Sequence, residues 1–100
     1  MKKIINGRKY DTETAIKMFC FDHEPEDRLY RYSETLYRKQ NGEFFLHGEG
    51  GPASIYGLKV RYCTWRSGCK IKPLSRYKAL EWIRENCSEE DYLNLASMGV

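Results

Sequence analysis

The sequence has no long hydrophobic run and only a short apolar stretch near its first residue. A membrane-spanning helix needs about 20 consecutive, predominantly apolar residues, and no segment of this chain approaches that length. The first residues, MKKIINGRKYD, include two lysines, but polar residues return directly after the two isoleucines. This segment therefore lacks the apolar core of a signal peptide, and we expect a cytoplasmic protein.

Recognisable catalytic motifs are also missing. The stretch HGEGG is similar to the glycine loops of oxyanion holes, but the chain has no G-x-S-x-G elbow, and His47 beside Glu49 has no identifiable nucleophile. The stretch GEGGP lacks the G-K-[ST] ending of a phosphate-binding loop. A turn that needs positive φ values explains these glycines more simply. We therefore expect neither an enzyme nor a small-molecule substrate.

What the chain does contain fits one small domain. One hundred residues suffice for a single domain over residues 1–100 with a modest core. Apolar residues make up 41% of the chain, but they include eight Tyr and only four Phe. Because a tyrosine keeps a polar group at its edge, we expect a small core and a surface rich in aromatic side chains.

The first part of the sequence predicts a short strand with a turn, followed by a helix. The segments KKII and RKY flank Asn6-Gly7, a pair that is typical of tight turns. Asp11 or Thr12 is a suitable cap for a helix that continues to about Phe21. The apolar residues that would share one face of this helix are Ala15, Ile16 and Phe19.

The middle of the chain predicts two hairpins. Asn41-Gly42 lies between two aromatic-rich segments and is the strongest hairpin signal, because a type I′ turn needs positive φ at both positions. A two-residue loop there would place Tyr37 opposite Leu46 and Arg38 opposite Phe45. After the break at GEGGP, the segments LKVRYCTW and CKIKP are expected to form a second hairpin closed around Arg66 in RSG.

The C-terminal part predicts two helices. Pro73 should end the sheet, and Ser75 is a suitable cap for the first helix. Ser88, with Asp91 three residues later, should begin the second. The residues spaced to face the sheet are Tyr77, Leu80, Ile83 and Cys87. Together these segments predict a single small α+β domain with an antiparallel sheet of about four strands, an N-terminal helix and two C-terminal helices.

Two pairs of side chains have the chemistry of metal ligands. If the second hairpin turns about Arg66, Cys63 and Cys69 face each other with Cβ atoms about 4.5–5.5 Å apart. Cys20 and His23 would project to one side near the end of the expected N-terminal helix. Three sulfurs and one imidazole are a soft ligand set that suits tetrahedral zinc. We therefore predict a structural zinc site formed by these four residues.

Other interpretations of the thiols stay open. The spacing C-x2-H followed by C-x5-C is not a standard zinc-finger pattern. Reduced cysteines are among the most buried residues, so they could instead fill the core. A disulfide is disfavoured in a reducing cytoplasm. Cys87 fits the core role because it directly precedes the Ser88 cap and could pack on Tyr92, and His47 is a reserve ligand.

Charge is distributed unevenly along the chain, although the net charge is only +3. Residues 59–78 contain seven basic residues and no acid, whereas DHEPED, residues 22–27, has four acids in six positions. The basic segment could contact an acidic protein surface or a nucleic acid, or it could simply be a solvated hairpin face. The candidate partner-binding residues are Arg61, Arg66, Lys70 and Lys72.

Three segments of the chain carry a resemblance to a known group of proteins. These segments are INGRKYDTETA, ETLYRKQNGEFFLHGEGGP and IKPLSRYKALEWIRENCSEEDY. Their succession resembles a family of small uncharacterised proteins from phages and integrative elements of Gram-positive bacteria. The resemblance covers most of the chain, but FCFDHEPED and YCTWRSGC depart from the family pattern, which is rich in glycine and serine there. The zinc prediction therefore stands on spacing alone.

The resemblance implies a protein carried by a mobile element. Some short phage proteins of this kind resemble anti-CRISPR proteins, which bind a CRISPR effector and block its function. We therefore expect a non-enzymatic inhibitor that binds a host defence protein, with an RNA-guided type II CRISPR nuclease as the expected target. The alternative is a small basic nucleic-acid-binding or transcription-control protein that uses residues 59–78, although no helix-turn-helix or RNA-recognition signature supports it.

Overall fold

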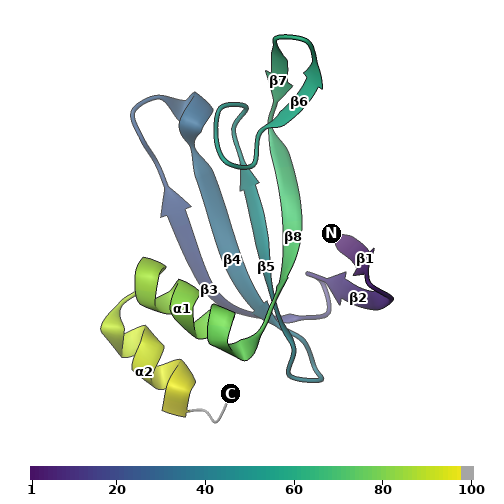
Figure 1. Ribbon diagram of the computed structural model, residues 1–100. Coiled ribbons are helices and arrows are strands. Elements are labelled where there is room, and N and C mark those ends of the chain that lie inside the picture. Colours follow the sequence, from purple (N-terminus) through teal and green to yellow (C-terminus); the bar gives the residue numbers. More distant parts are fainter. Residues whose placement is uncertain (98–100) are drawn as a thin grey trace.

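The computed structural model describes residues 1–97, and most of its elements are strands (Figure 1). In chain order they are β1 (Lys2–Ile5), β2 (Arg8–Asp11), β3 (Ile16–His23), the 3-10 helix η1 (Arg28–Tyr30), β4 (Tyr32–Arg38), β5 (Phe44–Gly50), β6 (Leu58–Arg61), β7 (Thr64–Arg66), β8 (Gly68–Leu74), α1 (Arg76–Asn86) and α2 (Glu89–Ser97). The main antiparallel sheet has the order β3-β4-β5-β8, while β1 pairs with β2 and β6 pairs with β7. The predicted α+β class, with four sheet strands and two C-terminal helices, is confirmed.

The predicted N-terminal helix is wrong, because residues 16–23 form strand β3. Asp11, which was predicted to cap that helix, instead stabilises a single turn. Its carboxylate accepts a hydrogen bond from the Glu13 N–H at 3.0 Å, and its carbonyl accepts one from the Ala15 N–H at 3.1 Å. Beyond this turn, Phe19 and Phe21 lie on one face of the sheet and pack against the main core. The two-residue period of a strand therefore overrides the short helical pattern.

The predicted turn at Asn6-Gly7 is confirmed. Its two residues have φ values of 52° and 77°, as a type I′ turn requires, and the flanking Ile5 and Arg8 pair directly. The β1–β2 ribbon covers the sheet face that lies away from the helices. There Tyr10 packs on Phe45 and Ile71 in a second cluster of buried residues.

The β4–β5 hairpin turns where it was predicted, but with a different loop and register. Gly42 has a φ of 90° and its N–H bonds the Lys39 carbonyl at 2.9 Å, while the Lys39 N–H bonds the Glu43 carbonyl at 2.7 Å. The loop therefore has three residues with glycine in the left-handed position. Tyr37 consequently lies opposite Phe45, not Leu46, and Arg38 lies opposite Phe44, not Phe45. A shift of one residue exchanges the two faces of a strand, so Phe45 and Leu46 enter different cores.

The predicted second hairpin around Arg66 is also wrong. Strand β6 pairs with β7 through a turn at Tyr62-Cys63, with Arg61 opposite Thr64. Strand β8 begins at Gly68 and pairs with β5 instead. A Cβ atom at Gly68 would lie 2.7 Å from Leu58 Cγ, closer than side chains approach. The glycine therefore marks the point where the chain passes from the ribbon into the main sheet.

Helix α1 covers one half of the main sheet (Figure 1). It buries Ala79, Trp82 and Ile83 in a cluster with the sheet residues Leu36, Phe44 and Leu46. Of the residues predicted to face the sheet, Ile83 is buried but Tyr77 is 72% exposed. The described helices include none that is long and apolar enough to cross a membrane.

Both predicted caps of the C-terminal helices are confirmed. The Ser75 hydroxyl accepts a hydrogen bond from the Lys78 N–H at 3.2 Å, and the Ser88 hydroxyl accepts one from the Asp91 N–H at 3.1 Å. These bonds satisfy backbone donors that a helix start leaves without a partner.

Candidate functional site

The four predicted zinc ligands lie apart from one another. Cys20 and His23 are on strand β3, and residues three apart on a strand point to opposite faces of a sheet. The Cys20 sulfur accepts a hydrogen bond from the Thr35 hydroxyl at 3.6 Å, whereas the His23 ring packs on Tyr32 with 4.9 Å between ring centres. The predicted pair on one side of a helix is therefore wrong.

Cys63 and Cys69 do not face each other either. Cys63 is in the β6–β7 turn, while Cys69 is on β8 with its sulfur 3.8 Å from the Met1 sulfur. Because β3 and β8 are opposite edges of the sheet, three strand spacings, about 14 Å, separate Cys20 from Cys69. Within residues 1–97, no three His, Cys, Asp or Glu side chains are grouped to hold a metal ion. The structure therefore brings together neither Cys20 with His23 nor Cys63 with Cys69, the two pairs from which the zinc site was predicted. The site itself stays a prediction, which metal analysis can test.

The four predicted partner-binding residues divide between two surfaces. Arg61 and Arg66 are exposed on the β6–β7 ribbon. Lys70 and Lys72 are on β8, on the sheet face that carries α1, and Lys72 Nζ lies 4.9 Å from the centre of the Tyr56 ring. The two lysines therefore border a packed loop, whereas the two arginines belong to a projecting ribbon.

This ribbon, residues 58–66, is called the β6–β7 arm below. Figure 1 shows it beyond the end of the main sheet, at the end opposite to α1. All of its strand residues are exposed, and Tyr62 at its turn is 90% exposed. Its exposed large apolar side chains are Leu58, Val60, Tyr62 and Trp65, and its basic ones are Lys59, Arg61 and Arg66. Apolar side chains gathered on the surface of a soluble domain indicate an interaction site.

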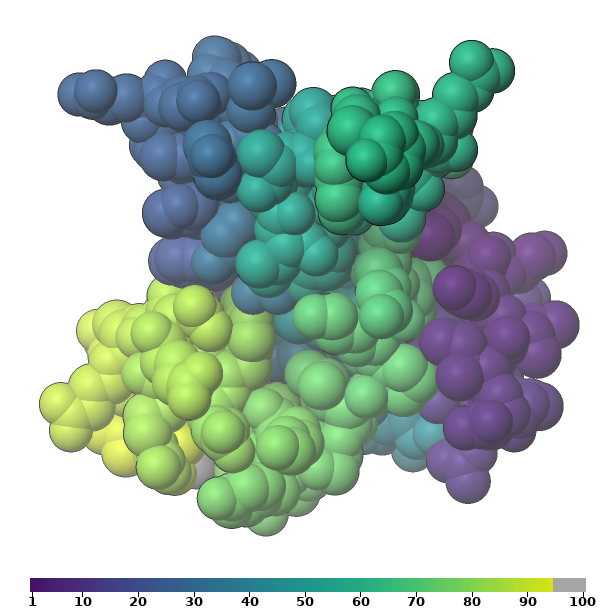
Figure 2. Space-filling model, turned by 45° about the horizontal axis from the view of Figure 1, so that its top comes forward, coloured from purple at the N-terminus to yellow at the C-terminus, as the bar shows by residue number. Residues whose placement is uncertain are grey.

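A groove of about 480 Å³ lies at the base of the arm. Its lining residues are Leu29, Tyr30, Pro52, Ala53, Ser54 and Trp65. In Figure 2 the teal loop of residues 51–57 lies between the blue residues of the η1 region and the green arm. The Ala53 N–H bonds the Leu29 carbonyl at 2.9 Å, and a Cβ at Gly51 would lie 2.6 Å from the same oxygen. The groove wall is therefore fixed by backbone contacts, and Gly51 permits their close approach.

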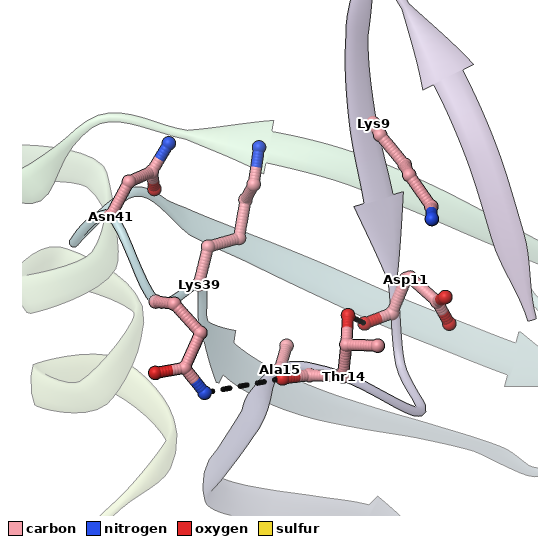
Figure 3. Close-up of a pocket in the computed structure, with 7 residues that line it drawn as sticks. Lys9, Asp11, Thr14, Ala15, Lys39 and Asn41 are labelled. Atoms are coloured by element: carbon pink, nitrogen blue, oxygen red, sulfur yellow. Dashed lines mark hydrogen bonds between the residues drawn. The ribbon is translucent and has the colours of Figure 1, made fainter.

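A second hollow, of about 290 Å³, lies between the turn after β2 and the β4–β5 loop (Figure 3). Two of its charged side chains, Asp11 and Lys39, are already engaged. Lys39 Nζ lies 3.3 Å from a Glu43 oxygen and 4.5 Å from the Tyr10 ring centre. Gln40 Nε2 donates to the Thr14 carbonyl at 3.4 Å across the hollow. These contacts attach the N-terminal ribbon to the main sheet, so we assign the hollow a structural role.

A buried carboxylate, which sequence reasoning missed, connects three parts of the fold. Glu34 on β4 is only 8% exposed, and it accepts hydrogen bonds from the Tyr56 hydroxyl and from Trp82 Nε1, the latter at 3.0 Å. Burial is the main cause that raises the pKa of Tyr56 above its usual range, so the phenol stays a donor. A Cβ at Gly48 would overlap the Tyr56 ring. The network joins the 51–57 loop and α1 to the sheet.

A sequence signal for this network existed. Glu34 is two residues before the buried Leu36, so on a strand it must share the core-facing side. A carboxylate at such a position needs donors, which Tyr and Trp side chains can supply. The groove and the exposure of Trp65 had no comparable signal, because they depend on where the arm leaves the sheet.

Comparison of this chain with protein families, with curated proteins and with solved structures finds no match. The functional proposal below therefore depends on the surface of the molecule and on the resemblance described from its sequence.

Proposed function

We propose that this protein is a non-enzymatic inhibitor that binds a host defence protein in the host cytoplasm, with an RNA-guided CRISPR nuclease as the proposed target. The observation that supports partner binding is the β6–β7 arm, where Tyr62 and Trp65 are exposed beside basic residues. The nature of the target comes from the resemblance to phage and mobile-element proteins.

The arm has the residue types that dominate binding energy at protein interfaces. Tyr, Trp and Arg are enriched among the residues whose truncation costs most affinity. Trp65 is 54% exposed and borders the apolar groove, so a partner side chain could cover both at once. The β1–β2 ribbon, in contrast, has one exposed large apolar strand residue, Ile4.

The charge of the arm favours an acidic partner surface. Lys59, Arg61 and Arg66 are exposed there, and no acidic residue occurs between Glu49 and Glu81. Complementary charge increases association rates and disfavours wrong partners. Effector nucleases hold nucleic acid in basic channels, so we expect the arm to bind an acidic surface of the target and not the channel itself.

The test is capture of effector proteins from a host lysate, followed by binding of the purified candidate. The unmodified chain should retain the effector nuclease and inhibit its DNA cleavage. Replacing Tyr62 and Trp65 by Ala should weaken binding at least about tenfold, because hot-spot truncations cost 2 kcal/mol or more. The matched control is Tyr77→Ala, since Tyr77 is also a largely exposed tyrosine but lies on α1, far from the arm.

Two results would contradict this function. One is an effector nuclease that neither binds the protein nor loses activity in its presence. The other is equal loss of binding in the arm variant and in Tyr77→Ala, since the arm would then have no special part in recognition.

A second candidate function is nucleic-acid binding, which the exposed aromatic and basic side chains of the arm also favour. Bases stack on aromatic rings, and lysine and arginine neutralise phosphates. Labelled DNA or RNA should then bind with an affinity that falls steeply with salt, and the Tyr62 and Trp65 replacements should weaken it. A protein inhibitor should instead leave free nucleic acid unshifted.

A further inference from the structure

Strand β3 is an open edge of the main sheet. It pairs with β4 on one side, and no strand of residues 1–97 pairs with its other side. The strand is eight residues long and apolar in part, with Ile16 half exposed and Phe19 and Phe21 only partly buried. A long, partly apolar edge strand is a template for pairing with another strand.

The other edge of the sheet is less suited to pairing. Strand β8 contains Pro73 near its end, and proline has no N–H to donate to a neighbouring strand. Its two charged residues, Lys70 and Lys72, have the same sign and discourage pairing at this edge, whereas Lys17 and Asp22 of β3 have opposite signs.

The pairing register of β3 leaves seven residues in the ladder. A bulge between Lys17 and Phe19 removes Met18 from it. The remaining positions are, in order, Ile16, Lys17, Phe19, Cys20, Phe21, Asp22 and His23. Cys20 is the middle one, with three positions on each side.

This ladder is complementary to itself. If two copies of β3 pair antiparallel about a two-fold axis at Cys20, Phe19 lies opposite Phe21 of the second copy and Lys17 lies opposite Asp22. The bulge is needed for this match, because without it Met18 would lie opposite Asp22. Lys17 and Asp22 are both exposed, and neither forms a salt bridge in the described chain.

We propose that this protein forms a two-fold symmetric dimer in which β3 of each copy pairs with the other and joins the two main sheets into one. The two aromatic pairs lie on the face that carries α1, whereas the two charge pairs and the facing Cys20 side chains lie on the opposite face. Aromatic and opposite-charge pairs each stabilise facing strands. The dimer is independent of the proposed inhibitor function.

The test is a charge-reversal cycle read by sedimentation equilibrium under reducing conditions. The unmodified chain should dimerise. Lys17→Glu and Asp22→Lys, each alone, place like charges opposite each other twice per dimer, so each should raise the dissociation constant about tenfold. The double variant Lys17→Glu/Asp22→Lys restores opposite charges and should restore the dimer. The matched control Lys3→Glu changes an exposed lysine of β1 and should have no effect.

A covalent test locates the axis. In a Cys63→Ser/Cys69→Ser chain, diamide should join two Cys20 side chains: both thiols lose their protons, the S–S bond forms, and diamide takes up two electrons and two protons as its hydrazine. Adding Cys20→Ser should abolish the covalent dimer. Protein that stays monomeric up to about 1 mM overturns the proposal. So does a dimer that is insensitive to both charge reversals, or one in which Cys20 does not crosslink.

Discussion

The covered half of the molecule, which is α1 with the part of the main sheet beneath it, and the β6–β7 arm both contain tryptophan and aliphatic side chains, but only in the covered half does a second layer bury them. Trp82 in the covered half is 7% exposed, whereas Trp65 on the arm is 54% exposed. In the covered half, burial of apolar side chains stabilises the folded chain. The arm can gain comparable free energy only when a partner covers it. Position in the fold, more than residue type, therefore decides which of these side chains are buried.

Truncating one side chain in each region tests whether the two regions contribute differently to stability. Leu36→Ala should lower the free energy of unfolding by about 3–4 kcal/mol, because Leu36 is fully buried and its truncation leaves a cavity in the core. Tyr62→Ala should change it by less than about 0.5 kcal/mol. Urea denaturation followed by circular dichroism measures both. Similar losses in the two variants would mean that the arm is part of the cooperative core.

Removal of the buried carboxylate should have the next largest effect. Glu34→Ala leaves the Tyr56 hydroxyl and Trp82 Nε1 without their shared acceptor, at a cost of about 2–3 kcal/mol in unfolding free energy. The control is Glu49→Ala, which removes an exposed carboxylate from β5 and should cost less than about 0.5 kcal/mol. Equal urea midpoints for the two variants would contradict a stabilising role of the network.

Charge reversal tests whether the arm and strand β8, which share the basic segment, differ in partner binding. Arg61→Glu with Arg66→Glu alters the arm, whereas Lys70→Glu with Lys72→Glu alters the border of the packed 51–57 loop. We expect the arm pair to reduce the rate of partner association about tenfold and the β8 pair to reduce it less. Reversal of the acidic residues Glu89, Glu90 and Asp91 is the control. Equal slowing in all three variants, measured by surface plasmon resonance, would argue against the arm as the binding face.

The smallest expected effect concerns the cysteines. Because Cys20 and Cys69 occupy opposite edges of the sheet, the structure predicts that chelation with EDTA leaves the melting temperature of the purified protein unchanged, whereas the zinc site predicted from the sequence requires it to fall. Metal analysis should be run on the same sample, purified without chelator. About one zinc per chain together with a lower melting temperature after chelation would show that the predicted ligands meet in solution.

The parts of the fold that could be predicted from sequence are those that neighbouring residues determine. The turn at Asn6-Gly7 and the caps at Ser75 and Ser88 follow from local backbone preferences and hydrogen bonds. For residues 16–23 the sequence predicts a helix, because Asp11 and the apolar spacing are equally compatible with a helix until pairing with β4 is known. Tertiary pairing decides such short segments.

The arrangement of the candidate site likewise depends on strand pairing that the local sequence does not determine. The basic character of Arg61 and Arg66 is visible in the sequence, but their separation from Lys70 and Lys72 is not. It follows from β8 pairing with β5, a strand that begins 24 residues earlier in the chain, in place of the adjacent β7. That choice moves the turn to Tyr62-Cys63 and removes the predicted contact between the two cysteines.

The turn residue Cys63 has a consequence for experiments on the arm. Its φ of 61° is a backbone conformation that residues other than glycine rarely adopt. Its thiol is exposed at the tip of the arm. A maleimide fluorophore or a nitroxide attached there, with Cys20 and Cys69 replaced by Ser, would stand where we expect a partner to arrive. The chain thus has its own attachment point for a spectroscopic probe, and partner docking could be followed in real time as a change in emission or in label mobility.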